Sequence, residues 1–403
     1  MAGIGRTGDV DVAVVGAGLA GLTAAVALAA ARVGTALVGR HSRQDRRSTA
    51  LLVGSVAALD ALGVWAGCAA HAAPLRRLRI IDDTGRLIRS PEVVFDASEI
   101  GLAAFGHCIE NRHLLAALEA RTRDLPALFR VEHDAQAIKI GARQVDIRFD
   151  GGAVSARLAI GADGRRSLCR VAAGIAADER KYPQAALTFT VRHTRPHNDI
   201  STEFHRATGP FTLVPLPGRR SSIVWVLDTA TAAKLAALDD AALAVEAERT
   251  SHSILGGFAI EGGRSVFPLA FATARQFARN RVALIGEAAH LVPPIGAQGL
   301  NLGLRDAATL AELVVAACRN GADVGGAELL RRYDAARRAD VDSRAFAIDL
   351  LNRSLLSDFL PLQGVRGLGL YLIGRIGPLR RALMREGVQP TAAAPRLMRG
   401  ERL

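Results

Sequence analysis

The stretch that decides the fold is RVALIGEAAHLVPPIGAQGLNLGLRD, residues 281–306. An apolar run at residues 282–285 predicts a buried strand that ends at Gly286 and is followed by the acidic Glu287. A turn rich in proline and glycine comes next, and a helix is predicted to begin near Gly299 with its apolar residues on one face. This order of strand, turn and helix is typical of an α/β protein.

The same stretch has the chemistry of a flavin site. A carboxylate at a strand end can accept hydrogen bonds from ribityl hydroxyls, and small residues let the backbone approach a ring system. The start of the helix points unpaired N–H groups and a positive dipole end at the flavin edge where negative charge collects on reduction. On the residues alone, a flavin site and an ordinary strand–turn–helix are equally good interpretations.

A βαβ unit is predicted near the N-terminus, with strands at residues 10–15 and 35–38 and a helix between them that ends near Arg32. The uncharged run at residues 12–31 has the length of a membrane span, but it divides into a strand and a helix, so we interpret it as soluble core. The turn between them, GAGLAG at residues 16–21, matches the GxGxxG pattern of dinucleotide-binding folds.

Each glycine of this turn has a predicted role. Gly16 permits the tight turn, Gly18 lets a pyrophosphate approach, and Gly21 lets the helix pack on the strand. The acidic residue that usually holds the adenosine ribose at the end of the second strand is replaced by Gly39, and Arg40 follows. Arg40 would suit NADP, but the later motifs of the chain resemble those of FAD proteins and favour FAD with a missing ribose contact. A carboxylate introduced at Gly39 is then expected to tighten FAD by up to about tenfold, if the backbone there is not restricted to glycine.

Composition sets broad limits. The chain has 403 residues, half of them hydrophobic, enough for two or three domains. Its 51 Lys and Arg against 39 Asp and Glu give a net charge of +12, but no basic run carries interleaved aromatics, so no nucleic-acid partner is expected. The four cysteines are far apart and no metal-ligand motif is present, so neither disulfides nor a metal site is expected. The N-terminus lacks the pattern of a signal peptide, and a cytoplasmic protein is expected.

A third motif gives the chain its family resemblance. GADGRRSLCR, residues 161–170, follows a predicted strand at 158–160 and resembles the "DG" motif of flavin hydroxylases. Residues 281–306 resemble the "GD" motif of the single-component (group A) flavin monooxygenases, with Glu287 in place of the commoner Asp. Over nearly its whole length the chain is similar to the ubiquinone-biosynthesis hydroxylase family. The positions that match in residues 281–306 are His290, Pro294, Gln298, Gly299, Asn301, Gly303 and Asp306.

The resemblance implies an α/β fold of two domains, of the p-hydroxybenzoate-hydroxylase type. A Rossmann-like FAD-binding domain would comprise residues 1–72, 97–175 and 281–345. An inserted antiparallel-sheet substrate domain would comprise residues 73–96 and 176–280, and a helical region residues 346–403. Elements expected from the pattern are helices at 55–62, 230–247 and 331–351, a helix opening at Asn111, a hairpin at 73–94, and strands within 185–228 and at 265–269.

The resemblance also implies a reaction. NADH or NADPH would reduce non-covalently bound FAD, O₂ would add to give a C4a-hydroperoxide, and the distal oxygen would pass to a prenylated phenol in ubiquinone biosynthesis. No protein side chain is assigned as a catalytic acid or base. The residues expected to bind FAD are Gly16, Ala17, Gly18, Gly21, Arg47, Asn111, Asp163, Gly164, Gly286, Glu287, Gln298, Gly299, Leu300 and Asn301. Candidates for the substrate pocket are His205, Phe211, Trp225 and Phe267.

Other interpretations stay open. A sister flavoenzyme of the same fold, such as a prenyl reductase, a halogenase or a hydroxylase of soluble phenols, would carry the same motifs. A simple NAD(P)-dependent dehydrogenase would explain GAGLAG alone, and a non-catalytic subunit of a quinone-synthesis complex would explain Gly39. Apolar sequence with spaced arginines at residues 354–384 suits either a helical cap or an interfacial segment on the inner face of the cell membrane, beside other ubiquinone-biosynthesis proteins.

Overall fold

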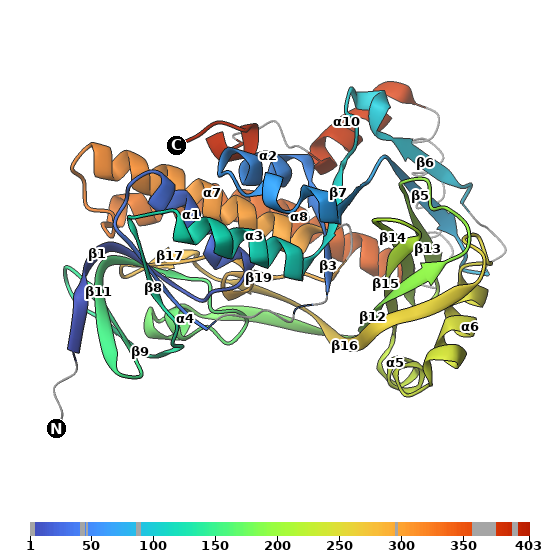
Figure 1. The fold of residues 1–403 in the computed structure, drawn as a ribbon, viewed down its shortest axis with the longest axis horizontal. Helices are drawn as coiled ribbons and strands as arrows, with labels where there is room; N and C mark the ends of the chain where they lie inside the picture. Colours follow the sequence, from blue (N-terminus) through green and yellow to red (C-terminus); the bar gives the residue numbers. More distant parts are fainter. Residues whose placement is uncertain are drawn as a thin grey trace.

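The computed structural model describes residues 5–40, 45, 47–85, 90–294, 297–356, 376–388 and 394–403. A mostly parallel sheet lies at one end of the molecule and an antiparallel sheet at the other, and the long strands β12 and β16 run between them (Figure 1). A small sheet of β3 (Ser48–Leu52), β7 (Gly106–Glu110) and β4 (Ala72–Pro74) lies between the two ends.

The first sheet has the order β17–β18–β11–β1–β2–β8, with β10 and β9 added beside β11. The four central pairings, β18 with β11, β11 with β1, β1 with β2 and β2 with β8, are parallel. Its strands are β1 (Gly5–Val15), β2 (Thr35–Val38), β8 (Leu128–Val131), β9 (Ala135–Ile140), β10 (Val145–Phe149), β11 (Gly152–Gly161), β17 (Ala278–Arg279) and β18 (Val282–Leu284).

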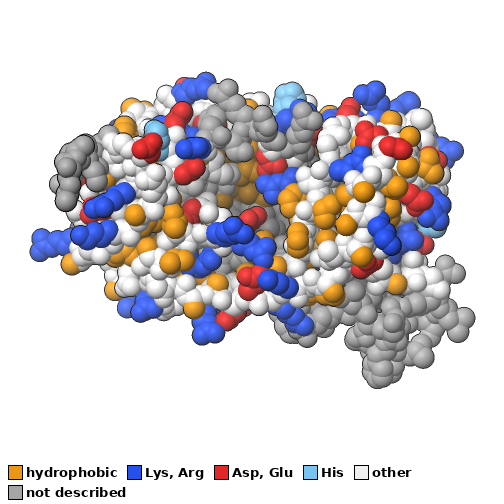
Figure 2. All heavy atoms as spheres, turned by 90° about the horizontal axis from the view of Figure 1, so that it is seen from below, with side chains coloured by type: hydrophobic (Ala, Val, Ile, Leu, Met, Phe, Trp, Pro, Cys, Tyr) orange, Lys and Arg blue, Asp and Glu red, His pale blue; other side chains and the backbone are white. Residues whose placement is uncertain are grey.

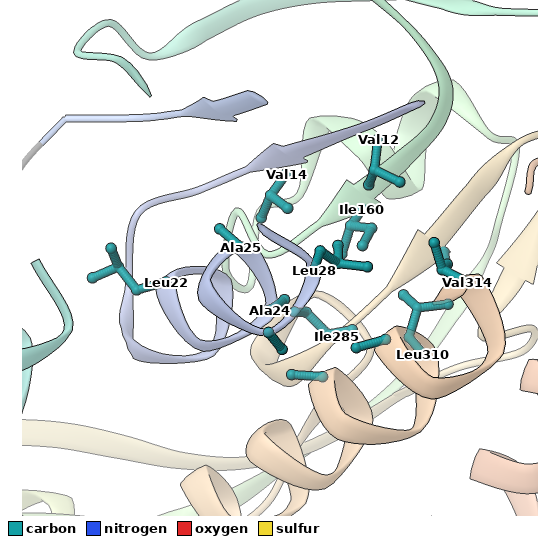
Figure 3. Packing of buried hydrophobic residues seen from close by; sticks show 14 of the residues in the cluster. Val12, Val14, Leu22, Ala24, Ala25, Leu28, Ile160, Ile285, Leu310 and Val314 are labelled. Carbon is teal, nitrogen blue, oxygen red and sulfur yellow. The ribbon is translucent and has the colours of Figure 1, made fainter. Parts of the chain in front are cut away.

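Helices cover this sheet and give it an apolar core. α1 (Leu19–Ala30), α3 (Asn111–Arg123), α7 (Gln298–Arg319) and α8 (Ala327–Leu356) pack there, with α2 (Val53–Ala61) on α7 and the short α4 (Leu168–Ala172) by β11. Side chains of α1 and α7 meet those of β1 and β11, and Leu28, Ile160 and Leu310 are fully buried (Figure 3). Each buried leucine of this kind contributes about 1.5–3 kcal/mol. The interpretation of residues 12–31 as strand and helix in a core is therefore confirmed.

The second sheet has the order β19–β16–β12–β15–β14–β13–β5–β6. Its pairings are antiparallel except that of β13 with β5. Its strands are β5 (Arg77–Asp82), β6 (Val93–Asp96), β12 (Ala177–His193), β13 (Ile200–Arg206), β14 (Gly209–Leu216), β15 (Arg220–Asp228), β16 (Phe258–Ala274) and β19 (His290–Leu291). The two residues of β19 attach the stretch after Glu287 directly to β16.

Two helices, α5 (Thr229–Ala236) and α6 (Asp240–Thr250), cover one face of this sheet. A single helix at 230–247 was expected, and that prediction is wrong. The chain breaks before Asp239, whose carboxylate accepts a hydrogen bond from the backbone N–H of Ala242 at 2.7 Å and caps α6. The alanine-rich pattern hides this stop because alanine favours a helix on both sides of it.

Other expected elements agree closely with the structure. The strand at 35–38 is β2, the helix at 331–351 lies within α8, and the strand at 265–269 lies within β16. The hairpin is β5 with β6, but Ala73 belongs to β4, which pairs with β7 instead. The segment expected at 354–384 is described only at its start and as α10 (Gly377–Val388); the rest lies outside the described residues.

Single-turn helices complete the described chain: η1 (Trp65–Gly67), η2 (Ala69–His71), η3 (Ala97–Ile100), η4 (Gly286–Ala288) and η5 (Arg396–Arg399). Within the described ranges, no helix combines the length and apolar character needed to cross a bilayer. Lysine and arginine side chains are scattered over the face seen from below rather than gathered into one patch (Figure 2).

Candidate active site

Two adjoining cavities lie where the sheets meet. The smaller, of about 450 Å³, lies at the carboxyl ends of the neighbouring parallel strands β1, β11 and β18, the usual ligand position in such sheets. The larger, of about 1060 Å³, lies against β12, β15 and β16. Residues that line both cavities are Asp45, Arg47, Ser48, Glu287, Leu291 and Val292.

The three glycines of the GxGxxG turn have different roles: two are required for packing, and one lines the smaller cavity. Gly16 has φ +109°, and a Cβ there would lie 2.3 Å from the carbonyl oxygen of Ala162. A Cβ on Gly21 would lie 2.0 Å from the carbonyl oxygen of Gly16. A Cβ on Gly18 would meet nothing within 4 Å, and Gly18 lines the smaller cavity. Gly16 and Gly21 are therefore needed for the fold, whereas Gly18 keeps a cavity wall bare.

Gly39 is required by packing, which corrects an expectation from the sequence. Its φ is +156°, and a Cβ there would lie 2.8 Å from the backbone nitrogen of Ala17. The condition for the expected effect of Gly39→Glu, a backbone not restricted to glycine, is not met, because a side chain there would push β2 away from the glycine turn. A carboxylate does reach this strand end from the loop after β8: the N–H of Arg40 donates to Asp134 at 3.2 Å.

A polar network holds the wall shared by the two cavities. Arg47 Nη2 lies 2.7 Å from Asp45 Oδ2, and Asn111 Nδ2 donates to the same oxygen at 2.9 Å. The Arg47 guanidinium lies 5.7 Å from the ring centre of Phe267 on β16. Hydrogen bonding to Asp45 raises the pKa of Arg47, and the charge of Glu287 adds to this effect. Burial raises the pKa of Asp45, but its bonds from Arg47 and Asn111 outweigh burial and lower it.

The start of α7 faces the smaller cavity. Ala297, with φ +55°, precedes the helix, and Gly299, Leu300 and Gly303 line the cavity wall. The N–H groups of a first helical turn have no partner within the helix and suit an anionic or carbonyl group. Gly303 is also close to the strand end, since a Cβ there would lie 3.2 Å from the Cα of Gly286.

Some predicted binding residues turn their side chains elsewhere. Asn301 accepts from Leu52 N at 2.9 Å and Ser55 Oγ at 2.7 Å and donates to two carbonyls, so its amide joins α7 to β3 and α2. Asp163 accepts from Ser167 Oγ at 2.5 Å and from Cys169 N at 3.1 Å, beside the start of α4.

The predicted residues thus fall into two groups. Those that line the smaller cavity are Gly18, Arg47, Asn111, Gly164, Gly286, Glu287, Gly299 and Leu300. Those that do not are Gly16, Ala17, Gly21, Asp163, Gln298 and Asn301. Direct contact with FAD stays a prediction for all of them. Cavity residues that the sequence did not single out for the cofactor include Asp45, Leu115 and Ala162, whereas His290, which matches the family motif, also lines the cavity.

The smaller cavity fits FAD on three observations. Two of its buried polar atoms, Asn111 Oδ1 and His290 Nδ1, have no hydrogen-bond partner among the residues that the structure describes. Gly18 offers bare backbone and α7 offers its N-terminus, as a pyrophosphate and an electron-rich ring edge require. Buried polar atoms are nearly always satisfied, so the two unpartnered atoms indicate a ligand with hydrogen-bonding groups.

The larger cavity has an apolar end and a charged end. Phe267, Leu269 and Val224 line it nearest β19, whereas Thr190 and Ser222 lie farther along the same strands. Beyond them Arg220 bonds to Glu261 and lies 3.4 Å from Glu110, which also contacts Arg112 at 3.0 Å. The charged residues were not expected from the sequence.

The four residues predicted to line the substrate pocket lie in different parts of the sheet. Phe267 lines the larger cavity. Phe211 and Trp225 are buried in the core under α5 and α6, and their rings meet edge-on at 5.0 Å. His205 is buried and bonds to Glu203 at 2.8 Å. Of these four residues, only Phe267 is brought to the cavity.

Comparison with known proteins decides the family. A family model described as "FAD binding domain" matches residues 9–345. The chain belongs to this family of FAD-dependent aromatic-ring monooxygenases. The flavoprotein is 35% identical over 410 residues to ubiquinone hydroxylase UbiL of Rhodospirillum rubrum, covering 97% of this chain and 92% of that protein. It is 31% identical over 388 residues to the 3-demethoxyubiquinol 3-hydroxylase of Escherichia coli, covering 93% and 97%.

Solved structures confirm the predicted fold of the monooxygenase. The p-nitrophenol 4-monooxygenase PnpA from Pseudomonas putida DLL-E4 has a TM-score of 0.79 at 19% identity, covering 96% of this chain and all (100%) of that one. A single-residue variant of Klebsiella pneumoniae HpxO, complexed with FAD, has a TM-score of 0.74 at 20% identity, covering 94% and 99%.

Glu287 of the monooxygenase gives a direct test of the strand-end carboxylate. It is exposed and lines both cavities. Glu287→Gln is expected to weaken FAD about tenfold, because hydrogen bonds from ribityl hydroxyls to a charged group are worth about 1.5–3 kcal/mol. Fluorescence titration of the apoproteins with FAD measures the change. If Glu287→Leu binds FAD as tightly as the parent, the carboxylate does not hold the ribityl chain.

Proposed function

We propose that this monooxygenase hydroxylates the aromatic ring of a prenylated phenol in ubiquinone biosynthesis, with NADH or NADPH as its transient reductant. Similarity to two ubiquinone-pathway hydroxylases over more than nine-tenths of the chain supports the pathway. The observation that carries the reaction type is the shared wall between the cavities. A flavin in the smaller cavity would meet a substrate ring in the larger one across Leu291 and Val292.

Bound FAD would accept a hydride and activate O₂. The protein itself would position the cofactor and the substrate ring and exclude water from between them. Glu287 and the first turn of α7 would hold the cofactor, and the apolar end of the larger cavity, at Phe267 and Leu269, would hold the ring beside it. The hydroxyls of Thr190 and Ser222 line the same cavity and would bind a ring oxygen. The division into an FAD domain (1–72, 97–175, 281–345), a substrate domain and a helical region is part of the same proposal.

A membrane contact would serve a prenylated substrate, and α10 is where we place it. Arg380 bonds to Glu99 at 2.6 Å, and Met384 and Val388 are buried, so one face of α10 is held to the protein. Ile376, Leu379 and Leu383 are 41–47% exposed at spacings of three and four residues, on one face. Arg381 and Arg385 are also exposed and suit anionic lipid headgroups.

Replacing Leu379 and Leu383 together by serine is expected to lower binding to phosphatidylglycerol vesicles about tenfold, because less apolar surface enters the lipid. Co-sedimentation measures the bound fraction. Val245→Ser is the matched control, since Val245 is 62% exposed on α6. Equal binding by the parent and the double variant would contradict a role for α10.

A second candidate is hydroxylation of a small soluble phenol. The observation that favours it is the charged end of the larger cavity, where Arg220, Glu110 and Glu261 would disfavour an alkyl chain. Turnover distinguishes the two. The purified, FAD-loaded enzyme is given a prenylated phenol or 4-nitrophenol, and hydroxylated product is counted per NAD(P)H oxidised. Tight coupling with the prenylated phenol alone supports the proposal, and tight coupling with 4-nitrophenol alone overturns it.

A further inference from the structure

His290 lies at the border between the loop after Glu287 and the substrate sheet. It is the first residue of β19 and is only 2% exposed. Its Nε2 lies 2.6 Å from Asp306 Oδ2. Its Nδ1 is buried and has no partner in the described part of the chain, and the residue lines the smaller cavity. The protein thus holds Nε2 of the ring, and Nδ1 is left available to a ligand.

Asp306 fixes the ring. Its carboxylate is fully buried and also accepts hydrogen bonds from Gly286 N at 2.9 Å and Arg337 Nε at 2.6 Å. Arg337 in turn bonds to Asp340 at 2.7 Å, so α8, the backbone at Gly286 and His290 of β19 together hold this carboxylate of α7. Burial raises the pKa of Asp306, but its interactions with His290 and Arg337 outweigh burial and lower the pKa to about 2. The carboxylate therefore stays ionised and keeps the proton of the His290 ring on Nε2.

The neighbours of His290 leave Nδ1 unused. Thr273 is its cross-strand partner on β16, and the hydroxyl of Thr273 is likewise buried with no partner from any described residue. The ring of Phe277 lies 6.3 Å away, centre to centre, and offers no acceptor or donor of its own. In a neutral imidazole with its proton on Nε2, Nδ1 is a hydrogen-bond acceptor. A buried acceptor on a cavity wall is costly unless a ligand satisfies it.

We propose that His290 is a cofactor-binding residue whose Nδ1 accepts a hydrogen bond from a hydroxyl or N–H group of FAD. Asp306 and Arg337 act through it as positioning residues. This role rests on the proposed binding of FAD in the smaller cavity. It gives the buried network a purpose beyond joining α7 to α8: the network aims a hydrogen-bond acceptor at the cofactor.

Two amides separate this role from a purely structural one. His290→Gln places an amide nitrogen near the position of Nε2, so it can still donate to Asp306 but has no group at Nδ1. His290→Asn places an amide oxygen near Nδ1 but cannot reach Asp306. The two apoproteins are titrated with FAD by flavin fluorescence, and the melting temperature of each apoprotein is measured without FAD.

The proposal predicts that His290→Gln keeps the parent melting temperature and binds FAD about tenfold more weakly. His290→Asn is predicted to melt at a lower temperature and to bind FAD within about threefold of the parent. Parent-like affinity in His290→Gln would overturn the proposal. If that variant yields no folded apoprotein, the Asn variant decides: affinity within about threefold supports the role, and a loss of about tenfold or more overturns it. A parent that binds no FAD would refute the proposed function itself.

Discussion

Replacing Gly18 by valine is expected to abolish FAD binding while the apoprotein stays folded. Gly18 has φ −76° and ψ 178°, an extended backbone that valine adopts readily. A Cβ there meets no atom of the described residues within 4 Å, and Gly18 lines the smaller cavity, where a pyrophosphate must approach the backbone. The expected loss in affinity is at least about a hundredfold, or about 2.7 kcal/mol.

Fluorescence titration with FAD and circular dichroism of the apoprotein check both halves of this prediction. Gly21→Val is the matched control, because its Cβ would lie 2.0 Å from the carbonyl oxygen of Gly16 and should disrupt the fold. A Gly18→Val protein that retains its flavin would place the pyrophosphate elsewhere.

Asp306→Ala is expected to destabilise the apoprotein by about 3–5 kcal/mol, as when one member of a buried ion pair is removed. The substitution leaves Nε of the buried Arg337, Nε2 of His290 and the N–H of Gly286 without their acceptor. Urea unfolding measures the change. Asp323→Ala is the control, because Asp323 pairs with Arg281 at a side-chain exposure of 41% and should cost at most about 1 kcal/mol. If both variants lost the same free energy of unfolding, the buried Asp306 network would stabilise the protein no more than the exposed Asp323 pair does.

The stability difference between the parent and Asp306→Ala is expected to depend on pH. The pKa of Asp306 falls from its usual 3.8 to about 2 in the folded state, so its contribution to stability is complete above 3.8 and is lost as the pH falls through 2. The stability difference between the parent and Asp306→Ala should therefore shrink over this window. A difference that stays constant down to about pH 2 would contradict the ionised, paired state of Asp306.

The amino-acid pattern predicted the strands and helix starts that are determined by residues close together in the sequence. The apolar run at 35–38 is β2 because a strand between parallel neighbours is buried on both faces. The start of α7 follows from the glycine-rich turn before it. The break at Asp239 and the pairing of Ala73 with β7 were missed, because both depend on contacts that alanine-rich or short strand sequence does not encode.

The prediction of the candidate site was limited in the same way, because it gave positions but not long-range contacts. Motifs predicted that residues 16–21 and 285–287 meet, because both follow parallel strands. They did not reveal that Asn301 and Asp163 bond within the protein, since a motif gives position but not side-chain direction. The contact of Arg220 with Glu110 joins residues 110 positions apart, and no periodicity signals it. Gly39 was interpreted as a missing acid, but its backbone conformation and its contact with Ala17 explain the residue.

The central claim is transfer of one oxygen atom from O₂ to the ring of a prenylated phenol. The most direct measurement is mass spectrometry of the product after turnover of the FAD-loaded enzyme with NADH or NADPH under ¹⁸O₂. Oxygen transfer from O₂ predicts a prenylated product heavier by one ¹⁸O atom, and no such product from the Gly18→Val protein. A product that takes its oxygen from water, or oxidation of NAD(P)H that releases only hydrogen peroxide with every prenylated phenol offered, would contradict it.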